Sequence, residues 1–266
     1  MTGKVLGIIS IKGGVGKTTV TVALGFALAN EFGKKVLLVD TNFSAPNLAL
    51  HVGFVNPKRT IHNVLCDNMP AEKAVYASEY GFDILPGALV YGKINPSELR
   101  NKIMPLREKY DVILIDSSPT LNEEIVSAIL ASDEILVVTT PDHITLANTL
   151  LAIKLAKKSN VNVLGLVLNK VHRKSFELDI DEIEEISNSS VLAVVPYELK
   201  ILEALSRNVP STKHAMTDST VEYKKLAGAL IGKRYNDPRL KSRIKQMFSR
   251  KAPKQEINRN ALQKRA

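Results

Sequence analysis

The sequence predicts an α/β fold: a doubly wound, mostly parallel sheet with helices on both of its faces. Two observations lead to this prediction, namely that short runs of apolar, mainly β-branched residues recur along the chain and that stretches with helical spacing separate them. The runs are apolar at nearly every position, as strands buried on both faces require. Strands that alternate with helices lie parallel, because each helix carries the chain back across the sheet. We expect strands over 4–10, 35–40, 82–87, 111–116, 134–140, 161–169 and 191–196, and helices over 17–32, 96–109, 121–131, 145–158, 198–207 and 218–232.

The composition is that of a cytoplasmic protein with a large core. Of 266 residues, 45% are hydrophobic and 24% are charged, and no apolar run reaches the ~18 residues that a membrane-spanning helix needs. The N-terminus carries no signal-peptide pattern. The single cysteine, Cys66, has no partner for an internal disulfide, which favours a reducing compartment. The histidines are scattered, without the spacing of a structural zinc site.

The positive charge is concentrated at the end of the chain. Residues 233–266 contain twelve Lys or Arg and two acids, a net charge of +10. The whole chain carries +9, so residues 1–232 carry about −1. No linker or repeat precedes residue 233, and we therefore expect one domain over 1–232 followed by a basic tail over 233–266.

The first predicted strand runs into a glycine-rich segment, K-G-G-V-G-K-T-T, and then into a helix. Glycines allow backbone N–H groups to turn toward a phosphate, and the N-terminus of the following helix also favours an anion. Lys17 is placed to reach the β- and γ-phosphates, and the Thr18 hydroxyl is placed to ligate Mg²⁺. The segment predicts a site for ATP and Mg²⁺, with Gly13, Gly14, Val15, Gly16, Lys17, Thr18 and Thr19 as the binding residues.

The additional lysine in this segment, Lys12, gives it a resemblance to a known family. K-G-G-x-G-K-T resembles the deviant Walker A motif of the MinD/ParA ATPases, relatives of nitrogenase iron protein, with the MinD-like branch favoured. The resemblance implies a P-loop NTPase fold and an ATPase that forms a homodimer when ATP is bound. It also implies that Lys12 reaches across this sandwich dimer to the partner's ATP.

The resemblance extends over roughly 230 residues. KKVLLVD, ending in Asp40, together with the following segment that contains APNLAL (45–50), resembles the second strand and switch I. YDVILIDSSPT resembles the Walker B strand with Asp116, followed by switch II at 117–119. It implies Mg²⁺ coordination by Thr18, Asp40 and Asp116. LVLNKV places Asn169 at the adenine edge, and VVPYELK places the Pro196 loop beside the nucleotide.

Switch I departs from the family pattern at one position that matters for catalysis. Many MinD-like proteins have a second aspartate two positions after the first, and this chain has Asn42 there. An amide can hydrogen-bond the attacking water but cannot accept its proton. With Lys12, Lys17, Asp40 and Asn42 as the catalytic set, we expect hydrolysis that is slow, or that depends on Asp40 or on a protein activator or cargo partner. Thr120, where the family often has glycine, is a second departure.

The basic tail contains a predicted amphipathic helix at about 238–251. Asp237 suits its N-cap and Pro238 its first turn. Leu240, Ile244, Met247 and Phe248 fall on one narrow stripe, and Arg243 flanks it. This arrangement resembles the membrane-targeting helix of MinD, and it predicts peripheral association with the cytoplasmic membrane face.

Two alternative functions use the same features differently. The twelve basic residues of the tail would also suit a ParA-like partition ATPase that binds DNA without sequence specificity, although DNA binding leaves Ile244, Met247 and Phe248 unexplained. A site with weakened water activation would also suit a P-loop kinase acting on a small molecule, but no acceptor pocket is recognisable in the sequence.

Overall fold

One eight-stranded sheet organises the molecule in the computed structural model, which describes residues 2–89, 94–239 and 252–265. The strands are β1 (Lys4–Ile9), β2 (Val36–Thr41), β3 (Tyr76–Ala77), β4 (Asp83–Leu85), β5 (Val112–Ser117), β6 (Glu134–Thr139), β7 (Asn162–Val171) and β8 (Val191–Pro196). Their spatial order is β3-β4-β2-β5-β1-β6-β7-β8. All neighbouring strands pair in parallel except β3 and β4.

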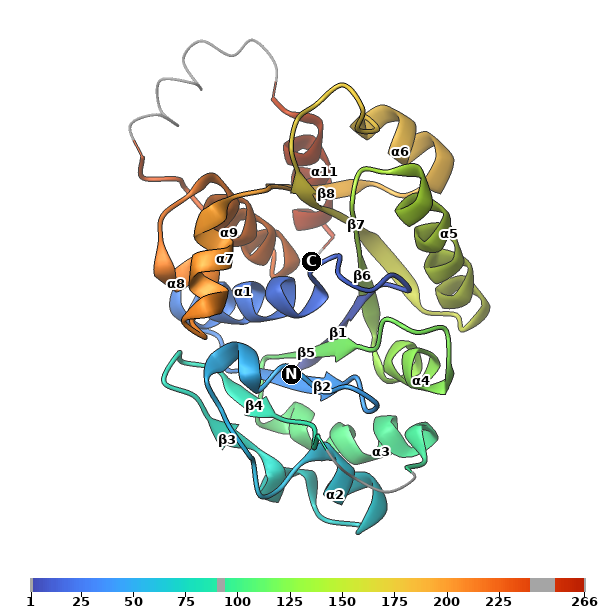
Figure 1. Cartoon of the computed structure of the whole chain (residues 1–266), viewed down its shortest axis with the longest axis vertical. Helices are drawn as coiled ribbons and strands as arrows, with labels where there is room; N and C mark the ends of the chain where they lie inside the picture. The colour runs from blue at the N-terminus through green and yellow to red at the C-terminus, as the bar shows by residue number, and fades with distance from the viewer. Residues whose placement is uncertain (1, 90–93, 240–251, 266) are drawn as a thin grey trace.

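Helices cover both faces of this sheet, as Figure 1 shows. Two separate clusters of buried apolar side chains lie between the sheet and its two helical layers. One layer contains α1 (Lys17–Asn30), α7 (Leu199–Ser206), α8 (Ser211–His214) and α9 (Asp218–Leu230). The other contains α2 (Ile61–Cys66), α3 (Leu99–Ile103), α4 (Glu123–Ala131), α5 (His143–Lys158) and α6 (Ile180–Ser187). Short 3₁₀ turns, η1 (Leu50–Val52), η2 (Ala71–Ala74), η3 (Pro96–Glu98) and η4 (Met104–Glu108), lie in the connections.

The predicted fold class is confirmed, and the differences from the prediction are local. The predicted helix over 96–109 is broken into η3, α3 and η4, because Pro105 in the first turn of η4 has no N–H to continue the α-helical hydrogen bonds. The short elements α2, α6 and α8 were not predicted. Of these, α6 begins with a capping box formed by Asp179 and Glu182.

Helix α1 lies close against the sheet, and this places the loop before it. At Gly25, a Cβ atom would come within 2.7 Å of a methyl group of Leu38 on β2. Glycine therefore allows the helix to approach the strand, and substitution would push the two apart. The loop that precedes α1 consequently lies at the carboxyl ends of the central strands, where open α/β sheets bind their ligands.

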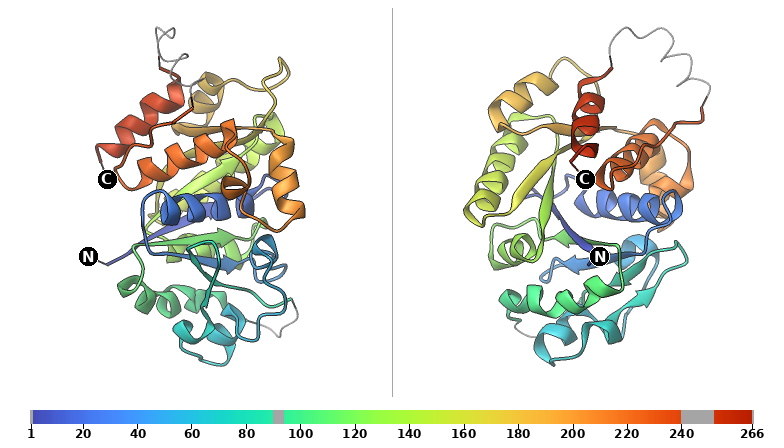
Figure 2. Two further views of the ribbon diagram at one scale, coloured as in Figure 1. Left: turned by 90° about the vertical axis from the view of Figure 1, so that its left-hand side faces the viewer. Right: turned by 180° about the vertical axis from the view of Figure 1, so that it is seen from behind.

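The end of the basic tail folds back onto the domain as α11 (Lys254–Gln263), another helix that was not predicted. It lies beside β8 and α9, as Figures 1 and 2 show. Its Arg259 is only 3% exposed. The guanidinium donates to the backbone oxygen of Leu192 on β8 at 3.0 Å and pairs with Glu222 on α9 at 2.6 Å. The Asn258 amide donates to the oxygen of Val191 at 2.9 Å, so that α11 covers an edge strand.

Of the predicted amphipathic helix at 238–251, residues 240–251 lie outside the described part of the chain. Pro238 and Arg239 are described and are not helical. After these undescribed residues comes α11, which packs on the domain.

We expect Arg259→Ala to lower the free energy of unfolding by about 3 kcal/mol, because it removes one partner of a largely buried ion pair. The measurement is urea denaturation followed by circular dichroism. Arg265→Ala is the control, since Arg265 is exposed near the end of the same segment. Equal midpoints for the two variants would mean that the docking of α11 does not contribute to stability.

Candidate functional site

The glycine-rich loop between β1 and α1 has a backbone that needs glycine at one position in particular. Gly16 has a φ of 94°, and a Cβ atom there would lie 2.4 Å from Nδ2 of Asn169. That amide donates to the oxygen of Val15 at 2.7 Å, and Nζ of Lys170 donates to the oxygen of Gly14 at 2.7 Å. The end of β7 thus holds the loop from one side, through Asn169 and Lys170.

Lys17 and Thr18 begin α1, and both side chains interact with Asp116. Lys17 is 7% exposed, and burial lowers the pKa of its amine while Asp116 opposes that shift. Thr18 Oγ1 lies 2.7 Å from Asp116 Oδ2 and 3.0 Å from Oδ1 of Asn47. A hydroxyl, a carboxylate and an amide oxygen therefore converge at the start of the helix, a set of hard oxygen donors that suits Mg²⁺.

Asp40 and Asp116 lie side by side because β2 and β5 pair in parallel with these two residues in register. Burial, followed by the neighbouring Asp116, raises the pKa of Asp40 to about 8. Burial also raises the pKa of Asp116, to about 6, against the opposing effects of Thr18, Lys17 and Thr21. A bound cation would favour the ionised form of both groups.

The carboxylate of Asp40 is engaged by the backbone of switch I. Its Oδ1 accepts from the N–H of Asn42 at 3.1 Å, and its Oδ2 accepts from those of Asn47 and Leu48 at 3.0 Å each. Asp40 is 1% exposed and does not line the cavity beside the loop. In this conformation Asp40 holds switch I in place, and Asp116 is the carboxylate that lies against Thr18.

Asn42 lies on the wall of the cavity, where the sequence places the residue that faces the attacking water. Its Nδ2 donates to the oxygen of Ala45 at 2.6 Å, which closes a tight turn within switch I. One N–H of the amide therefore anchors the side chain, and its oxygen can still accept a hydrogen bond from a water molecule.

The cavity brings together the loop, both switches and the segment after β8. It contains most of the residues predicted to bind nucleotide; Lys12 and Gly13 are exposed on the loop instead, and Val15 is buried beneath it. Asn47, His51, Lys170, Tyr197 and the lining side chains of α7 were not among the predicted site residues, although the helix itself was expected over 198–207. The lining residues are Gly14, Gly16, Lys17, Thr18, Thr19, Asn42, Asn47, His51, Ser117, Pro119, Asn169, Lys170, Pro196, Tyr197, Glu198, Ile201, Leu202 and Leu205.

Comparison with known proteins agrees with this geometry. Residues 3–163 match the family model described as AAA domain. An uncharacterised ATP-binding protein of Methanocaldococcus jannaschii is 30% identical over 86% of this chain and 88% of its own length. The cell division ATPase MinD of Pyrococcus furiosus superposes with a TM-score of 0.81 at 34% identity, over 85% of this chain and 97% of that one. The chain belongs to the MinD/ParA family of P-loop ATPases.

A second solved MinD contains Mg-ADP. The septum site-determining protein MinD of Pyrococcus horikoshii, solved with Mg-ADP, has a TM-score of 0.81 and 33% identity, over 85% of this chain and 95% of that one. As for the membrane, none of the helices within the described ranges of this MinD/ParA-family chain has the length and hydropathy needed to cross a bilayer.

We expect Gly16→Ala to lower the melting temperature of the nucleotide-free protein, by an amount that corresponds to about 1–3 kcal/mol. The new methyl group would meet Asn169 and would require a left-handed backbone. Gly13→Ala is the matched control, because nothing lies within 4 Å of a Cβ atom there and its φ is not positive. Differential scanning calorimetry of both variants measures the effect, and similar losses would argue against the Asn169 contact.

Proposed function

We propose that this chain is an ATP-dependent, dimerising switch ATPase of the MinD type, which attaches reversibly to a membrane surface and positions cellular machinery there. Its cofactors are ATP and Mg²⁺. The arrangement of Thr18 against Asp116 at the start of α1 carries this assignment, because it supplies the hydroxyl and the carboxylate for the metal directly beside the phosphate-binding loop. Bound there, Mg²⁺ would neutralise charge on the phosphates.

Different residues of the chain would bind different parts of the nucleotide. The N–H groups of the loop and the N-terminus of α1 would hold the phosphates, and the Lys17 amine would pair with the outer two. Asn169, already anchored on the loop, and the segment from Pro196 to Glu198 border the part of the cavity left for the base. The MinD of P. horikoshii solved with Mg-ADP supports the choice of ligand.

Slow hydrolysis follows from the state of switch I. Asn42 cannot take a proton from water, and the carboxylate of Asp40 is occupied by three backbone N–H groups. Neither group within one chain is therefore positioned to act as a general base in this conformation. A change in switch I, brought about by dimerisation or by a protein partner, would be needed to raise the rate.

Support for dimerisation comes from the surface beside the cavity. Leu199 and Leu202, on the first turns of α7, are 73% and 45% exposed, and Tyr197 next to them is 41% exposed. Lys12 is exposed on the phosphate-binding loop. An apolar rim and an accessible lysine around a nucleotide suit a sandwich in which a second copy closes the site.

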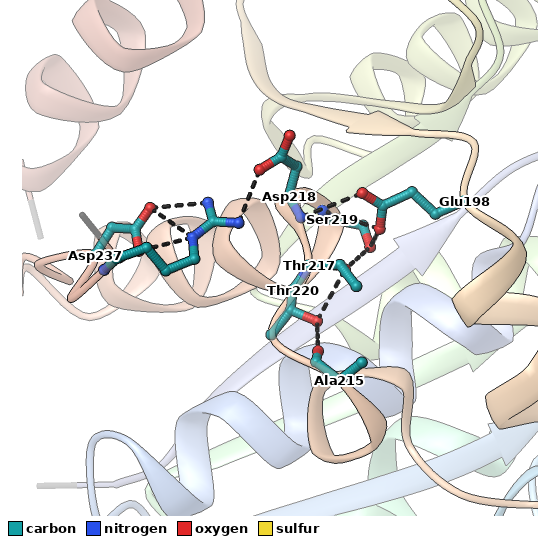
Figure 3. A network of polar contacts seen from close by, with 8 residues as sticks. Glu198, Ala215, Thr217, Asp218, Ser219, Thr220 and Asp237 are labelled. Atoms are coloured by element: carbon teal, nitrogen blue, oxygen red, sulfur yellow. Dashed lines mark hydrogen bonds and ion pairs between the residues drawn. The ribbon is translucent and has the colours of Figure 1, made fainter. Parts of the chain in front are cut away.

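Support for coupling between this rim and the tail comes from the polar network in Figure 3. Glu198, which lines the cavity, accepts hydrogen bonds from the backbone of Asp218 and Ser219 at the start of α9. The Asp218 carboxylate pairs with Arg239 at 2.8 Å, and Arg239 also pairs with Asp237. Two side chains thus connect the nucleotide cavity to the residue that precedes the stretch 240–251.

The magnitudes favour attachment that depends on the dimer. Half-burying four apolar side chains in a bilayer is worth roughly 3–5 kcal/mol, and the contribution of basic residues is about 1 kcal/mol each at best. Ordering some fourteen residues costs roughly 1 kcal/mol or more apiece. One segment therefore binds weakly, whereas two segments on one ATP-bound dimer share the cost of localisation.

We expect Asn42→Asp to raise steady-state ATP hydrolysis by about tenfold or more, because a carboxylate can activate the attacking water. The measurement is phosphate release from ATP in the absence of other proteins. Asn42→Ala is the control and should remain at least as slow as the unmodified chain. An unchanged rate for Asn42→Asp would show that Asn42 does not limit hydrolysis.

We expect ATP, but not ADP, to increase the fraction of the full-length chain that pellets with anionic liposomes, and we expect no binding to duplex DNA. Replacing Ile244 and Phe248 by Gln should abolish pelleting by removing half of the apolar stripe. The control is Phe176→Gln, which removes an aromatic side chain that is 78% exposed elsewhere on the surface. Truncation after residue 232 is unsuitable here, because it would also remove α11 from the edge of β8.

Two outcomes of this experiment would contradict the proposal. ATP-dependent binding to DNA that survives the Gln substitutions and weakens steeply with salt would favour the ParA-like alternative. Lipid binding that is equal in ATP and ADP would contradict the dimer-dependent switch. Lys12→Ala tests the same step, since it should reduce the effect of ATP without preventing nucleotide binding.

A further inference from the structure

Lys170, which follows Asn169 at the end of β7, has an unusual backbone conformation. Its φ is 58°, in the left-handed region that disfavours residues with a Cβ atom. Asn tolerates this region better than most residues, and the other non-glycine residues with a positive φ in the described chain are five Asn and Arg173. A lysine keeps such a conformation only where its surroundings determine it, and strained positions of this kind cluster at functional sites.

The strained backbone brings the side chains of two consecutive residues to the same loop. In a regular strand, neighbouring side chains point to opposite faces of the sheet. Here the register between β7 and β8 shifts around Asn169 and Lys170, and both side chains reach the glycine-rich loop. Nδ2 of Asn169 donates to the oxygen of Val15, and Nζ of Lys170 donates to the oxygen of Gly14, each at 2.7 Å. Two consecutive carbonyl groups of the loop are therefore held by the end of one strand.

Holding these two oxygens fixes the direction of two N–H groups. In a trans peptide the C=O and N–H groups point in opposite directions, and none of the described peptide bonds is cis. The oxygens of Gly14 and Val15 face β7, so the N–H groups of Val15 and Gly16 face away from it. Neither N–H donates to another group in the part of the chain that the structure describes. Adjacent N–H groups with a fixed direction and no partner suit an anion.

The stability of the fold does not explain a lysine at this position. The side chain is exposed, and ordering such a long side chain costs rotamer entropy that offsets the hydrogen bond it makes. The left-handed backbone adds a further cost, which glycine would avoid. Asn169 differs in this respect, because it is only 4% exposed and packs beneath Gly16. The benefit of Lys170 must therefore come from its effect on the loop.

We propose that Lys170 is a positioning residue for phosphate binding. Its hydrogen bond to Gly14 holds the N–H groups of Val15 and Gly16 in the direction that the α- and β-phosphates require, before the nucleotide arrives. Lys17 supplies the cation for the outer phosphates, so the amine of Lys170 acts on the loop and not on the ligand. The inference rests on the proposed nucleotide site, and it is independent of dimerisation and of membrane attachment.

The test compares nucleotide affinity with stability in the full-length chain. We expect Lys170→Ala and Lys170→Gly to weaken the binding of Mg-ADP and of Mg-ATP by the same factor of about ten, as the loss of one such hydrogen bond implies. Isothermal calorimetry measures both affinities. The melting temperatures of the nucleotide-free variants should differ, with Lys170→Gly above Lys170→Ala and at least equal to the unmodified chain, because glycine removes the backbone strain.

Arg173→Gly is the matched control. Arg173 has nearly the same backbone, with a φ of 59°, and it is not among the described residues that line the nucleotide cavity. We expect this change to leave the affinity for Mg-ADP unaltered. Equal losses of affinity in Arg173→Gly and Lys170→Gly, or no loss in either Lys170 variant, would overturn the proposal.

Three further outcomes would overturn the proposal by showing that Lys170 contacts the nucleotide itself. A larger loss for ATP than for ADP would place its amine on the γ-phosphate. A loss for ADP that is absent for magnesium pyrophosphate, measured by competition against ADP, would place it on the base or the sugar. A loss that disappears in 0.5 M salt would indicate an ion pair with a phosphate, because a hydrogen bond to a neutral carbonyl group depends little on ionic strength.

Failure of the inference and failure of the proposed function give different results. If the unmodified chain binds Mg-ADP and the Lys170 variants bind it equally well, only the role of Lys170 is wrong. If the unmodified chain does not bind Mg-ADP, the nucleotide site itself is wrong, and the role of Lys170 falls with it.

Discussion

The parallel pairing of β2 with β5 places two buried carboxylates next to each other, and the rest of the site depends on that constraint. Asp116 receives the hydroxyl of Thr18 from α1, and Asp40 receives three backbone N–H groups from switch I. Burial raises the pKa of both carboxyl groups, and the neighbouring Asp116 raises that of Asp40 further, whereas Thr18, Lys17 and Thr21 oppose the shift of Asp116. The pair is held in place by Thr18 at the start of α1 and by the backbone of switch I.

Two contacts hold switch I in place. Asp40 fixes the backbone at its start, and further along the hydroxyl of Ser44 donates to Glu124 on α4. Asn42 lies between these two attachments, within the wall of the nucleotide cavity. A change in either attachment would therefore shift Asn42 within the cavity wall.

On the other side of the nucleotide cavity, a hydrogen bond and an ion pair connect the cavity wall to α9 and Arg239. Glu198 joins the segment after β8 to the start of α9, and Arg239 joins that start to the beginning of the basic stretch 240–251. After that stretch, α11 packs on β8 through Arg259.

The sequence by itself determined the α/β class, every strand except β3 and the phosphate-binding loop, because each is encoded by a local pattern such as an apolar run or K-G-G-V-G-K-T-T. It did not determine the role of the residues that the loop contacts. The hydrogen bond from Ser44 to Glu124 joins residues 80 positions apart, and that from Asn169 to Val15 joins residues 154 apart. The docking of α11 depends likewise on Arg259 reaching β8 and α9, in a stretch whose composition resembles a solvated tail. Only the packed sheet decides such contacts, because it brings together side chains whose chemistry no local spacing records.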